Sequence, residues 1–252
     1  MKVLITGASS GIGRDLAREF AKLNYDLILV SRNIDKLEEL KNDLNKKYDI
    51  DIKIEICDLN FEKNCIELFE NNKDIDVLVN NAGFGAFGEF VNIDLNKELN
   101  LIKTNITAVH ILTKLYLKEM TKKNKGRILN VSSIAGNMPG PLMATYYASK
   151  AYVLRLSEGI KEELKRAKSN VKISVLQPGP VDTNFSDVAG VKFNSTALSS
   201  QYVAKYTVKQ FFKGKFNIIP GFSIKCVKFF SKIIPNNIMA KMCFMVQTRK
   251  KT

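Results

Sequence analysis

The sequence of 252 residues is poor in the side chains that build metal and disulfide sites. It has one histidine, His110, no tryptophan, and four cysteines, no two of which form a CxxC pair. These are too few soft ligands for a zinc site, and a domain of this size without a signal peptide does not need a disulfide scaffold. We therefore expect no metal site. We expect the thiols to be buried or unreactive and the compartment to be reducing and cytoplasmic.

Long hydrophobic runs are also missing. A membrane-spanning helix needs about 20 consecutive apolar residues, and no stretch approaches that length without a lysine. Met1 leads directly into an apolar strand and a glycine turn, so we expect no secretory signal. Hydrophobic residues make up 45% of the chain and charged residues 25%, which is typical of a globular rather than a disordered protein.

Acidic residues are absent from the last quarter of the chain. Residues 188–252 contain 12 Lys and Arg and no Asp or Glu, whereas residues 1–187 carry 27 basic and 25 acidic side chains. The formal net charge of +14 therefore belongs to the tail. We find no interleaving of basic and aromatic residues and no reading helix, so we expect no nucleic-acid partner.

Short β-branched runs alternate along the chain with longer stretches of helical period. Several runs are continuously apolar, as in a parallel sheet covered by helices on both faces. The pattern predicts an α/β fold with a doubly wound parallel sheet and ligands beyond the carboxyl ends of its strands. We expect one domain: a dinucleotide-binding and catalytic part over residues 1–213, then a last strand and a basic amphipathic helical tail over 214–252. The expected strands are Val3–Thr6, Leu27–Val30, Ile52–Cys57, Val77–Asn80, Arg127–Val131, Val171–Leu176 and Phe216–Ile219, and the expected helices include Gly13–Leu23, Ile34–Lys46, Lys97–Met120, Thr145–Ala167 and Ser199–Phe212.

The first strand-to-helix junction has three glycines in the spacing GxxxGxG. Glycines permit a tight turn and close approach of the backbone to a pyrophosphate, whose charge the helix N-terminus stabilises. The sequence therefore predicts a dinucleotide site in this turn. Its expected contacts are Gly7, Ser9, Ser10, Gly11, Ile12 and Gly13.

The second strand ends in Ser31 and Arg32 instead of the acidic residue that an NAD site uses to hold the ribose 2′-hydroxyl. A hydroxyl donor and a fixed cation suit a 2′-phosphate. This indicates NADP, with NADPH preferred over NADH. The alternative is that Arg32 merely caps a surface loop.

Tyr146 and Lys150 stand four residues apart on a predicted helix and so share one face. A free tyrosine has a pKa of about 10, and a neighbouring ammonium stabilises the phenolate and lowers that pKa. By itself the pair is a weak signal, and Tyr147 is a competing tyrosine.

Taken together, these motifs resemble the short-chain dehydrogenase/reductase family from Val3 to about Ile219, which implies a Rossmann fold. The resemblance selects Tyr146 over Tyr147, and Ser133 over Ser132. It rests on Thr6-Gly7-xxx-Gly11-x-Gly13, Asn80-Asn81-Ala82-Gly83, Asn105, Ser132-Ser133, Tyr146-xxx-Lys150 and Pro178-Gly179, in the family's order.

The resemblance implies a role for each catalytic position. Tyr146 would exchange a proton with the substrate oxygen, and Ser133 would hydrogen-bond that oxygen. Lys150 would bind the nicotinamide ribose and lower the Tyr146 pKa, and Asn105 would hold a water in a proton relay. The further cofactor contacts implied are Asp58, Leu59, Asn81, Gly83, Pro178, Val181 and Thr183, while Asn80 would tie strands together.

One position departs from the NADP-preferring pattern. Many such relatives carry a basic residue immediately before the second glycine, and Ser10 stands there in this chain. Arg14, just past the third glycine, does not obviously compensate. The NADP prediction therefore rests on Arg32.

The function implied is hydride transfer between nicotinamide and a ketone or secondary alcohol, with an apolar carbonyl compound or a 3-oxoacyl thioester as substrate. The alternatives are a dinucleotide-binding protein without turnover and a membrane-peripheral reductase of lipid-like ketones. A homodimer or homotetramer is implied through Lys97–Met120 and Thr145–Ala167. We expect a substrate lid over Pro180–Ser200, with apolar residues Phe185, Val188, Val191 and Phe193.

The tail allows two interpretations. In Ser223–Ile234, three lysines, Lys225, Lys228 and Lys232, fall on one narrow helical face, opposite a broad apolar face. Either the tail helices close over the cleft or a second subunit with their lysines in water, or they attach to an anionic membrane surface.

Overall fold

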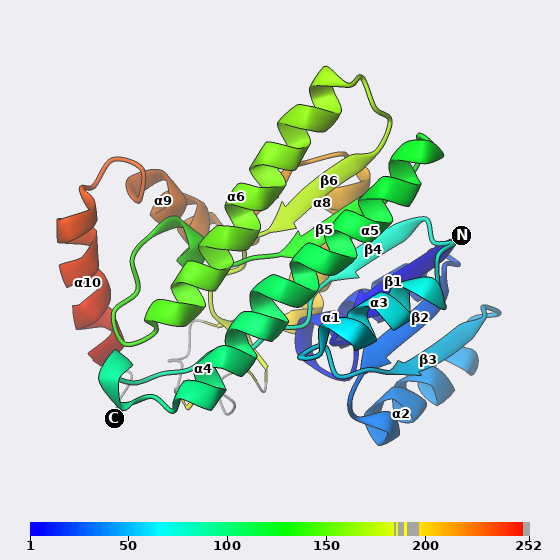
Figure 1. Ribbon diagram of the computed structural model, residues 1–252, viewed down its shortest axis with the longest axis horizontal. Coiled ribbons are helices and arrows are strands. Elements are labelled where there is room, and N and C mark those ends of the chain that lie inside the picture. Colours follow the sequence, from blue (N-terminus) through cyan, green and yellow to red (C-terminus); the bar gives the residue numbers. More distant parts are fainter. Residues whose placement is uncertain (184, 186–188, 191–196, 249–252) are drawn as a thin grey trace.

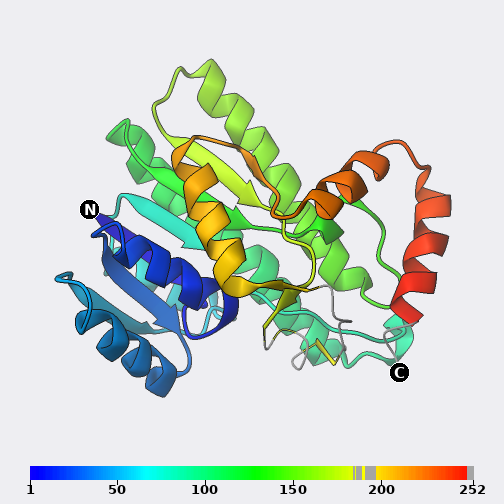
Figure 2. The same cartoon turned by 180° about the vertical axis from the view of Figure 1, so that it is seen from behind.

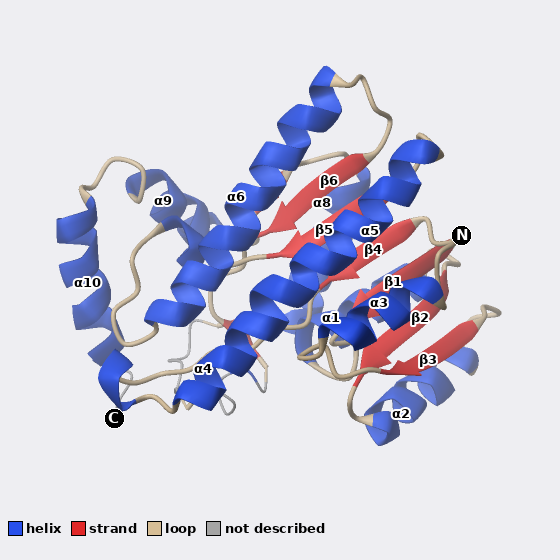
Figure 3. Cartoon of the chain, in the orientation of Figure 1, coloured by secondary structure: helices blue, strands red, loops and turns tan. Residues whose placement is uncertain are grey.

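The computed structural model describes residues 1–183, 185, 189–190 and 197–248. Seven strands form one sheet in the order β3-β2-β1-β4-β5-β6-β9 (Figure 3). Every neighbouring pair is parallel, which confirms the predicted doubly wound α/β fold. The strands are β1 (Lys2–Thr6), β2 (Asp26–Ser31), β3 (Ile52–Ile56), β4 (Val77–Asn80), β5 (Arg127–Val131), β6 (Lys172–Leu176) and β9 (Asn217–Ile218).

Helices cover both faces of the sheet, because the strands are apolar on both sides (Figures 1 and 2). On one face, Phe20 of α1 (Gly11–Ala21) meets Phe211 of α8 (Ser200–Phe212) edge to face, with ring centroids 6.3 Å apart. On the other, Phe69 of α3 (Glu62–Glu70) packs in the same way on Tyr116 of α5 (Val109–Lys122), at 5.0 Å. The first layer is α1, α2 (Ile34–Asn45) and α8; the second is α3, which the helical pattern did not single out, with α5 and α6 (Ala144–Arg166).

The chain reverses its direction of winding between β1 and β4, which is where open α/β sheets bind ligands. Side chains at the strand ends hold this junction together. The Thr6 hydroxyl accepts hydrogen bonds from the backbone N–H of Asn81 and of Ala82, both at 3.0 Å. Asn80 donates to Asn130 on β5 at 2.9 Å, so it ties neighbouring strands.

The helix predicted over Lys97–Met120 is present, but it is not a uniform α-helix. It consists of α4 (Leu95–Ile102), a π-helical turn (Lys103–Ala108) and α5, which follow one another without a break. A π turn adds a residue to the helical repeat and commonly occurs at functional sites. It contains Asn105, whose side chain is fully buried against the backbone of Phe84.

The remaining elements lie around the carboxyl end of the sheet. A short parallel pair, β7 (Val181–Asp182) and β8 (Leu198–Ser199), flanks the expected lid. Of the apolar residues predicted there, Phe185 is described, and Val188, Val191 and Phe193 lie outside the described residues. Short 3-10 turns occur at Phe90–Asn92 and Ile134–Asn137, and the tail forms α9 (Phe222–Phe230) and α10 (Asn236–Thr248). None of the helices in the described ranges has the length and apolar character needed to cross a bilayer.

Candidate active site

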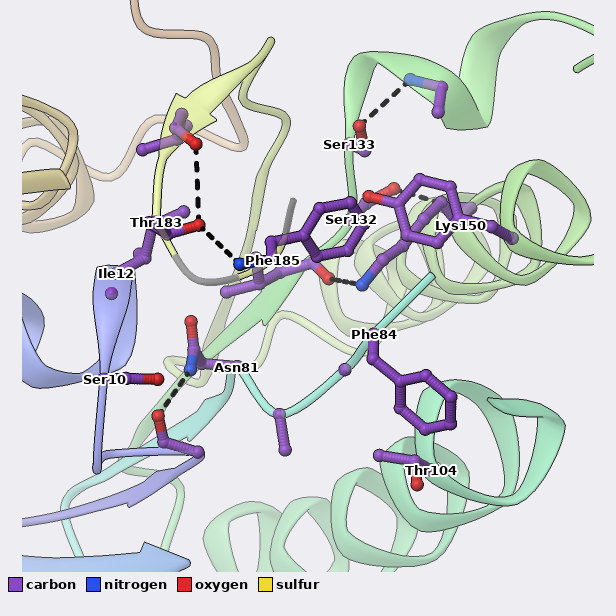
Figure 4. Close-up of a pocket in the computed structure, with 18 of the residues that line it drawn as sticks. Ser10, Ile12, Asn81, Phe84, Thr104, Ser132, Ser133, Lys150, Thr183 and Phe185 are labelled. Carbon is purple, nitrogen blue, oxygen red and sulfur yellow. Dashed lines mark hydrogen bonds between the residues drawn. The ribbon is translucent and has the colours of Figure 1, made fainter. Parts of the chain in front are cut away.

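A cleft of about 700 Å³ opens at the carboxyl ends of β1, β4 and β5. Figure 4 shows Ser10 and Ile12 on one side, Ser133 and Lys150 on the other, and Asn81 between them. All the predicted site residues line it or lie directly behind its wall. Those that line it are Gly7, Ser9, Ser10, Gly11, Ile12, Ser31, Arg32, Asp58, Leu59, Asn81, Gly83, Ser133, Tyr146, Lys150, Pro178, Val181 and Thr183, whereas Gly13 and Asn105 lie behind.

The glycine turn between β1 and α1 has no room for side chains. Gly7 and Gly11 have φ of +66° and +52°, in the left-handed region that favours glycine. A Cβ on Gly13 would stand 2.3 Å from the Gly7 carbonyl oxygen. Ser10 makes no side-chain cap on α1, so the helix N-terminus faces the cleft without one. This arrangement fits a pyrophosphate group.

Ser31 and Arg32 lie at the end of β2, beside the glycine turn. The Ser31 hydroxyl donates to the Ser9 hydroxyl at 2.8 Å. Arg32 is exposed and has no ion-pair partner within the described part of the chain. Arg14, by contrast, has its Nε 3.6 Å from the buried carboxylate of Asp15. Arg32 is therefore the cation at this end of the cleft that is available to a phosphate.

Tyr146 and Ser133 meet at the opposite end of the cleft. Ser133 lies two residues beyond the end of β5 and caps the 3-10 helix that follows. Its Oγ accepts from Ala135 N at 3.2 Å and donates to the Pro178 carbonyl at 3.3 Å. A side-chain hydrogen bond links Ser133 to Tyr146. Burial raises the pKa of Tyr146 to about 12, and the bond to Ser133 acts in the opposite direction. The pKa of Tyr146 is therefore raised in this structure, not lowered as the sequence predicts, because the effect of burial exceeds that of the hydrogen bond with Ser133.

Lys150 lies one helical turn from Tyr146 on α6, with Nζ 5.8 Å from the centre of the tyrosine ring. Its ammonium donates to the carbonyl of Val131 at 3.0 Å, and the residue is only 5% exposed. Burial lowers the pKa of Lys150 to about 8. The Ser132 hydroxyl donates to the Lys150 carbonyl at 2.7 Å and so fixes this part of α6 against β5.

Asn105 connects the π turn to the loop after β4. Its Oδ1 accepts from Phe84 N at 3.1 Å, and its Nδ2 donates to Phe84 O at 2.9 Å and to Ser149 Oγ at 3.1 Å. A Cβ on Gly83 would lie 2.9 Å from Asn105 Oδ1 and 3.2 Å from Lys150 Nζ. Glycine at this position lets the loop pass directly over both side chains.

Tyr147 contacts a residue that sequence reasoning missed. Gln247, from α10, donates its Nε2 to the Tyr147 hydroxyl at 2.8 Å, and both residues line the cleft. Gln247 is 1% exposed. No local pattern could have indicated this contact, since the two residues are 100 positions apart.

Apolar side chains form the wall beside Tyr146. The Phe185 ring lies with its centre 5.2 Å from that of Tyr146, and Met143 packs against Ala189 in the same cluster. A Cβ on Gly85 would stand 2.8 Å from the Phe185 ring. The cleft therefore has a polar end at the glycine turn and an apolar compartment at the tyrosine.

Comparisons with known proteins place this geometry in a family context. The family model of the short chain dehydrogenases matches residues 1–191. An NADP-dependent 3-hydroxy acid dehydrogenase from Schizosaccharomyces pombe is 37% identical, over 74% of this chain and 73% of its own length. A 3-oxoacyl acyl-carrier-protein reductase from Rickettsia prowazekii is 34% identical over 73% and 74% of the two chains. A very-long-chain 3-oxoacyl-CoA reductase from Anas platyrhynchos is 33% identical, but the match spans 63% of its length.

Solved structures show the same architecture. A short-chain dehydrogenase from Sphingobium yanoikuyae, in complex with NADPH, superposes with a TM-score of 0.83 at 29% identity, covering 88% of each chain. A bulky-bulky ketone specific alcohol dehydrogenase from Comamonas testosteroni gives a TM-score of 0.80 at 28% identity, over 88% of this chain and 86% of that one.

Proposed function

Because the chain belongs to the short-chain dehydrogenase family and is a pyridine-nucleotide-dependent oxidoreductase, we propose that it is an NADPH-dependent reductase of apolar ketones. The observation that carries the proposal is that Tyr146, Ser133 and Lys150 lie together beside the apolar wall, in the same cleft as the glycine turn that fits a cofactor. Reduction is the direction expected in a compartment rich in NADPH.

The glycine turn and Arg32 would hold the cofactor. The first turn of α1 fits the pyrophosphate, and the exposed Arg32 guanidinium suits a 2′-phosphate through charge-assisted hydrogen bonds. When bound, NADPH supplies the hydride that the carbonyl carbon accepts. Asp58 and Leu59 would contact the adenine, Asn81 and Gly83 would line the cofactor, and Pro178, Val181 and Thr183 would contact its nicotinamide end.

The chain's own residues hydrogen-bond and protonate the carbonyl oxygen of the substrate. Ser133 Oγ donates a hydrogen bond to the carbonyl oxygen, and Tyr146 gives that oxygen its phenolic proton as the alcohol forms. The resulting phenolate is stabilised by the Lys150 ammonium one helical turn away. Asn105 would hold a relay water through which the proton on Tyr146 is replaced. It is a positioning residue as well, because it fixes the backbone of Phe84.

The substrate we propose is an apolar ketone, with a 3-oxoacyl thioester as the most specific form. Met143, Tyr147 and Phe185 offer it an apolar compartment. The Schizosaccharomyces pombe relative is named for 3-hydroxy acids, and the Rickettsia prowazekii and Anas platyrhynchos relatives are named for 3-oxoacyl compounds. The basic tail would also favour an acidic carrier of the acyl chain.

The decisive test compares two adjacent tyrosines. We expect Tyr146→Phe to lower the kcat for ketone reduction by roughly 100- to 10,000-fold, the contribution of a general acid, while NADPH fluorescence still reports cofactor binding. Tyr147→Phe removes a hydroxyl of similar burial whose partner is Gln247, so we expect its kcat to stay within about ten-fold of the parent. Equal rates for Tyr146→Phe and the parent protein would refute the proposed role.

Oligomerisation and location complete the proposal. We propose a homodimer or homotetramer through the segments α4–α5 and α6, where the exposed side chains of Leu99 and Ile102 support a covered surface. Light scattering that gives a monomer mass at micromolar concentration would refute the proposed assembly.

A reducing, cytoplasmic compartment is supported by the buried thiols of Cys57 and Cys65, whose pKa values burial raises to about 11 and about 12.

A further inference from the structure

The first tail helix, α9, packs on the body through Ile224 and Lys228. Ile224 packs so closely on Gly179 that a Cβ on that glycine would stand 2.4 Å from Ile224 Cδ1. One turn later, Lys228 donates from Nζ to Gln177 Oε1 and to Asn217 Oδ1, both at 3.1 Å. The interpretation in which the tail closes over the cleft with its lysines in water is therefore wrong on one point, the placement of Lys228.

The second tail helix, α10, uses one narrow side in the same way. Met239, Cys243 and Gln247 are buried and stand four residues apart, so they form a single stripe along the helix. The stripe ends at the bond from Gln247 to Tyr147 in the cleft wall. The inward faces of both helices are thus already occupied by the body of the protein.

The outward side of both helices is apolar. We call it the outer tail face. It holds ten of the 22 large hydrophobic residues that are exposed in the described part of the chain, within 27 of its residues, 222–248. Both tail helices project from the end of the sheet, and no other element of the described residues lies over this side (Figures 1 and 2). The residues of the outer tail face, with exposed fractions of 40% to 81%, are Phe222, Val227, Phe229, Phe230, Ile233, Ile238, Met242, Phe244, Met245 and Val246.

The charge around the outer tail face has one sign. Three exposed lysines lie beside it: Lys225 on α9, Lys232 in the turn that follows α9, and Lys241 on α10. No acidic residue occurs after Asp187 in the sequence, so the tail offers no acidic side chain to neutralise these ammonium groups. In the described residues none of the three lysines makes a salt bridge.

We infer that the outer tail face docks on an anionic lipid bilayer, with its apolar side chains in the interface and its lysines at the head groups. A second copy of the chain fits less well, because a symmetric contact would bring lysines against lysines. A polar protein surface would leave the phenylalanines without an apolar counterpart. The surface is continuous with the cleft wall through α10, so an apolar substrate would reach Tyr146 from the bilayer. The inference does not depend on the reaction catalysed.

Co-sedimentation of the full chain with vesicles tests the inference. We expect pelleting with vesicles of equal parts phosphatidylglycerol and phosphatidylcholine at low salt, weakening as salt rises, and much less with phosphatidylcholine alone. Phe229→Ser with Phe230→Ser should weaken partitioning at least about 100-fold, since burying each phenylalanine favours binding by roughly ten-fold or more. The matched control is Phe61→Ser, an equally exposed phenylalanine (59%) at the start of α3.

A pair of lysine substitutions tests the electrostatic contribution to vesicle binding. Lys225→Gln with Lys232→Gln should weaken partitioning to anionic vesicles about 25-fold, from roughly five-fold for each lysine near the surface. The control, Lys46→Gln with Lys165→Gln, removes two exposed lysines elsewhere and should leave partitioning unchanged. All variants should keep the parent's melting temperature and its rate with a water-soluble ketone, because surface changes of this kind barely affect stability.

Several outcomes would overturn the inference. One is a full chain that stays in the supernatant with anionic vesicles at low salt. Another is equal binding to neutral and anionic vesicles, and a third is a Phe229 and Phe230 double variant that still pellets like the parent. A dimer seen by light scattering that the double variant dissociates, without vesicle binding, would assign the surface to a second copy. If the parent protein binds anionic vesicles but does not reduce ketones, the proposed function is refuted and the membrane inference stands.

Discussion

The buried ammonium of Lys150 should make the protein less stable than a variant without it. Burial lowers the pKa of this lysine from 10.5 to about 8. Because one pKa unit corresponds to about 1.4 kcal/mol, keeping the ammonium in the folded protein at pH 7 costs about 3 kcal/mol. The hydrogen bond to Val131 O returns roughly 1 kcal/mol. We therefore expect Lys150→Met to raise the free energy of unfolding by about 2 kcal/mol at pH 7.

The pH dependence has a definite sign. Between pH 8 and pH 10.5 the unfolded chain binds a proton on Lys150 that the folded chain has released. Stability must therefore rise with pH across that window in the parent relative to Lys150→Met, and the advantage of the variant should shrink accordingly. The tyrosines with raised pKa values reduce stability above pH 10 in both proteins. Subtracting the unfolding free energy of the parent from that of Lys150→Met cancels this contribution.

Urea denaturation followed by circular dichroism, at pH 7 and at pH 9.5, measures these quantities. Lys165→Met is the matched control, because Lys165 is exposed on the same helix and should change neither the stability nor its pH dependence. Lys150→Met should also lose reductase activity. A variant that is less stable than the parent at pH 7, or whose advantage is the same at both pH values, would refute the reasoning.

Two further predictions concern the cofactor end of the cleft. Arg32→Ala should lower kcat/KM for NADPH by roughly ten- to 100-fold, which is the contribution of a charge-assisted contact. Ser31→Asp should reverse the cofactor preference toward NADH, because its carboxylate repels the 2′-phosphate. Equal kcat/KM for NADPH and NADH in the parent would contradict the predicted preference for NADPH. Gly13→Ala would place a Cβ 2.3 Å from the Gly7 carbonyl oxygen, so NADPH affinity measured by fluorescence titration should fall at least about ten-fold, and an unchanged affinity would show that the turn can relax.

Local spacing was enough to predict the parts of the site that lie on one element or at a strand end. Tyr146 and Lys150 share a helix face because they are four residues apart. The glycine turn could be identified because its spacing follows a strand and precedes a helix. In each case the residues are brought together by backbone geometry that a short stretch of sequence determines.

Contacts between distant elements could not be predicted in this way. Asn105 lies in a π turn within a segment of ordinary helical period, and its partners, Phe84 and Ser149, come from other elements. The same holds for Gln247, which reaches Tyr147 from the end of the chain. These contacts depend on how the elements pack, and periodicity carries no information about it.

The tail shows the limit most clearly. Periodicity correctly indicated that the helix containing Lys228 has a polar and an apolar side, but it does not say which side meets the body. That choice depends on what the body offers at the carboxyl ends of β6 and β9. The side-chain oxygens of Gln177 and Asn217 already accept from Asn137 and Gln177, and each can accept a second hydrogen bond, which the Lys228 ammonium donates. Burial lowers the pKa of Lys228 to about 8, so some stability is given up for this contact. Since α9 meets the body through Ile224 and Lys228, its phenylalanines are left on the outside, where only an apolar partner can cover them.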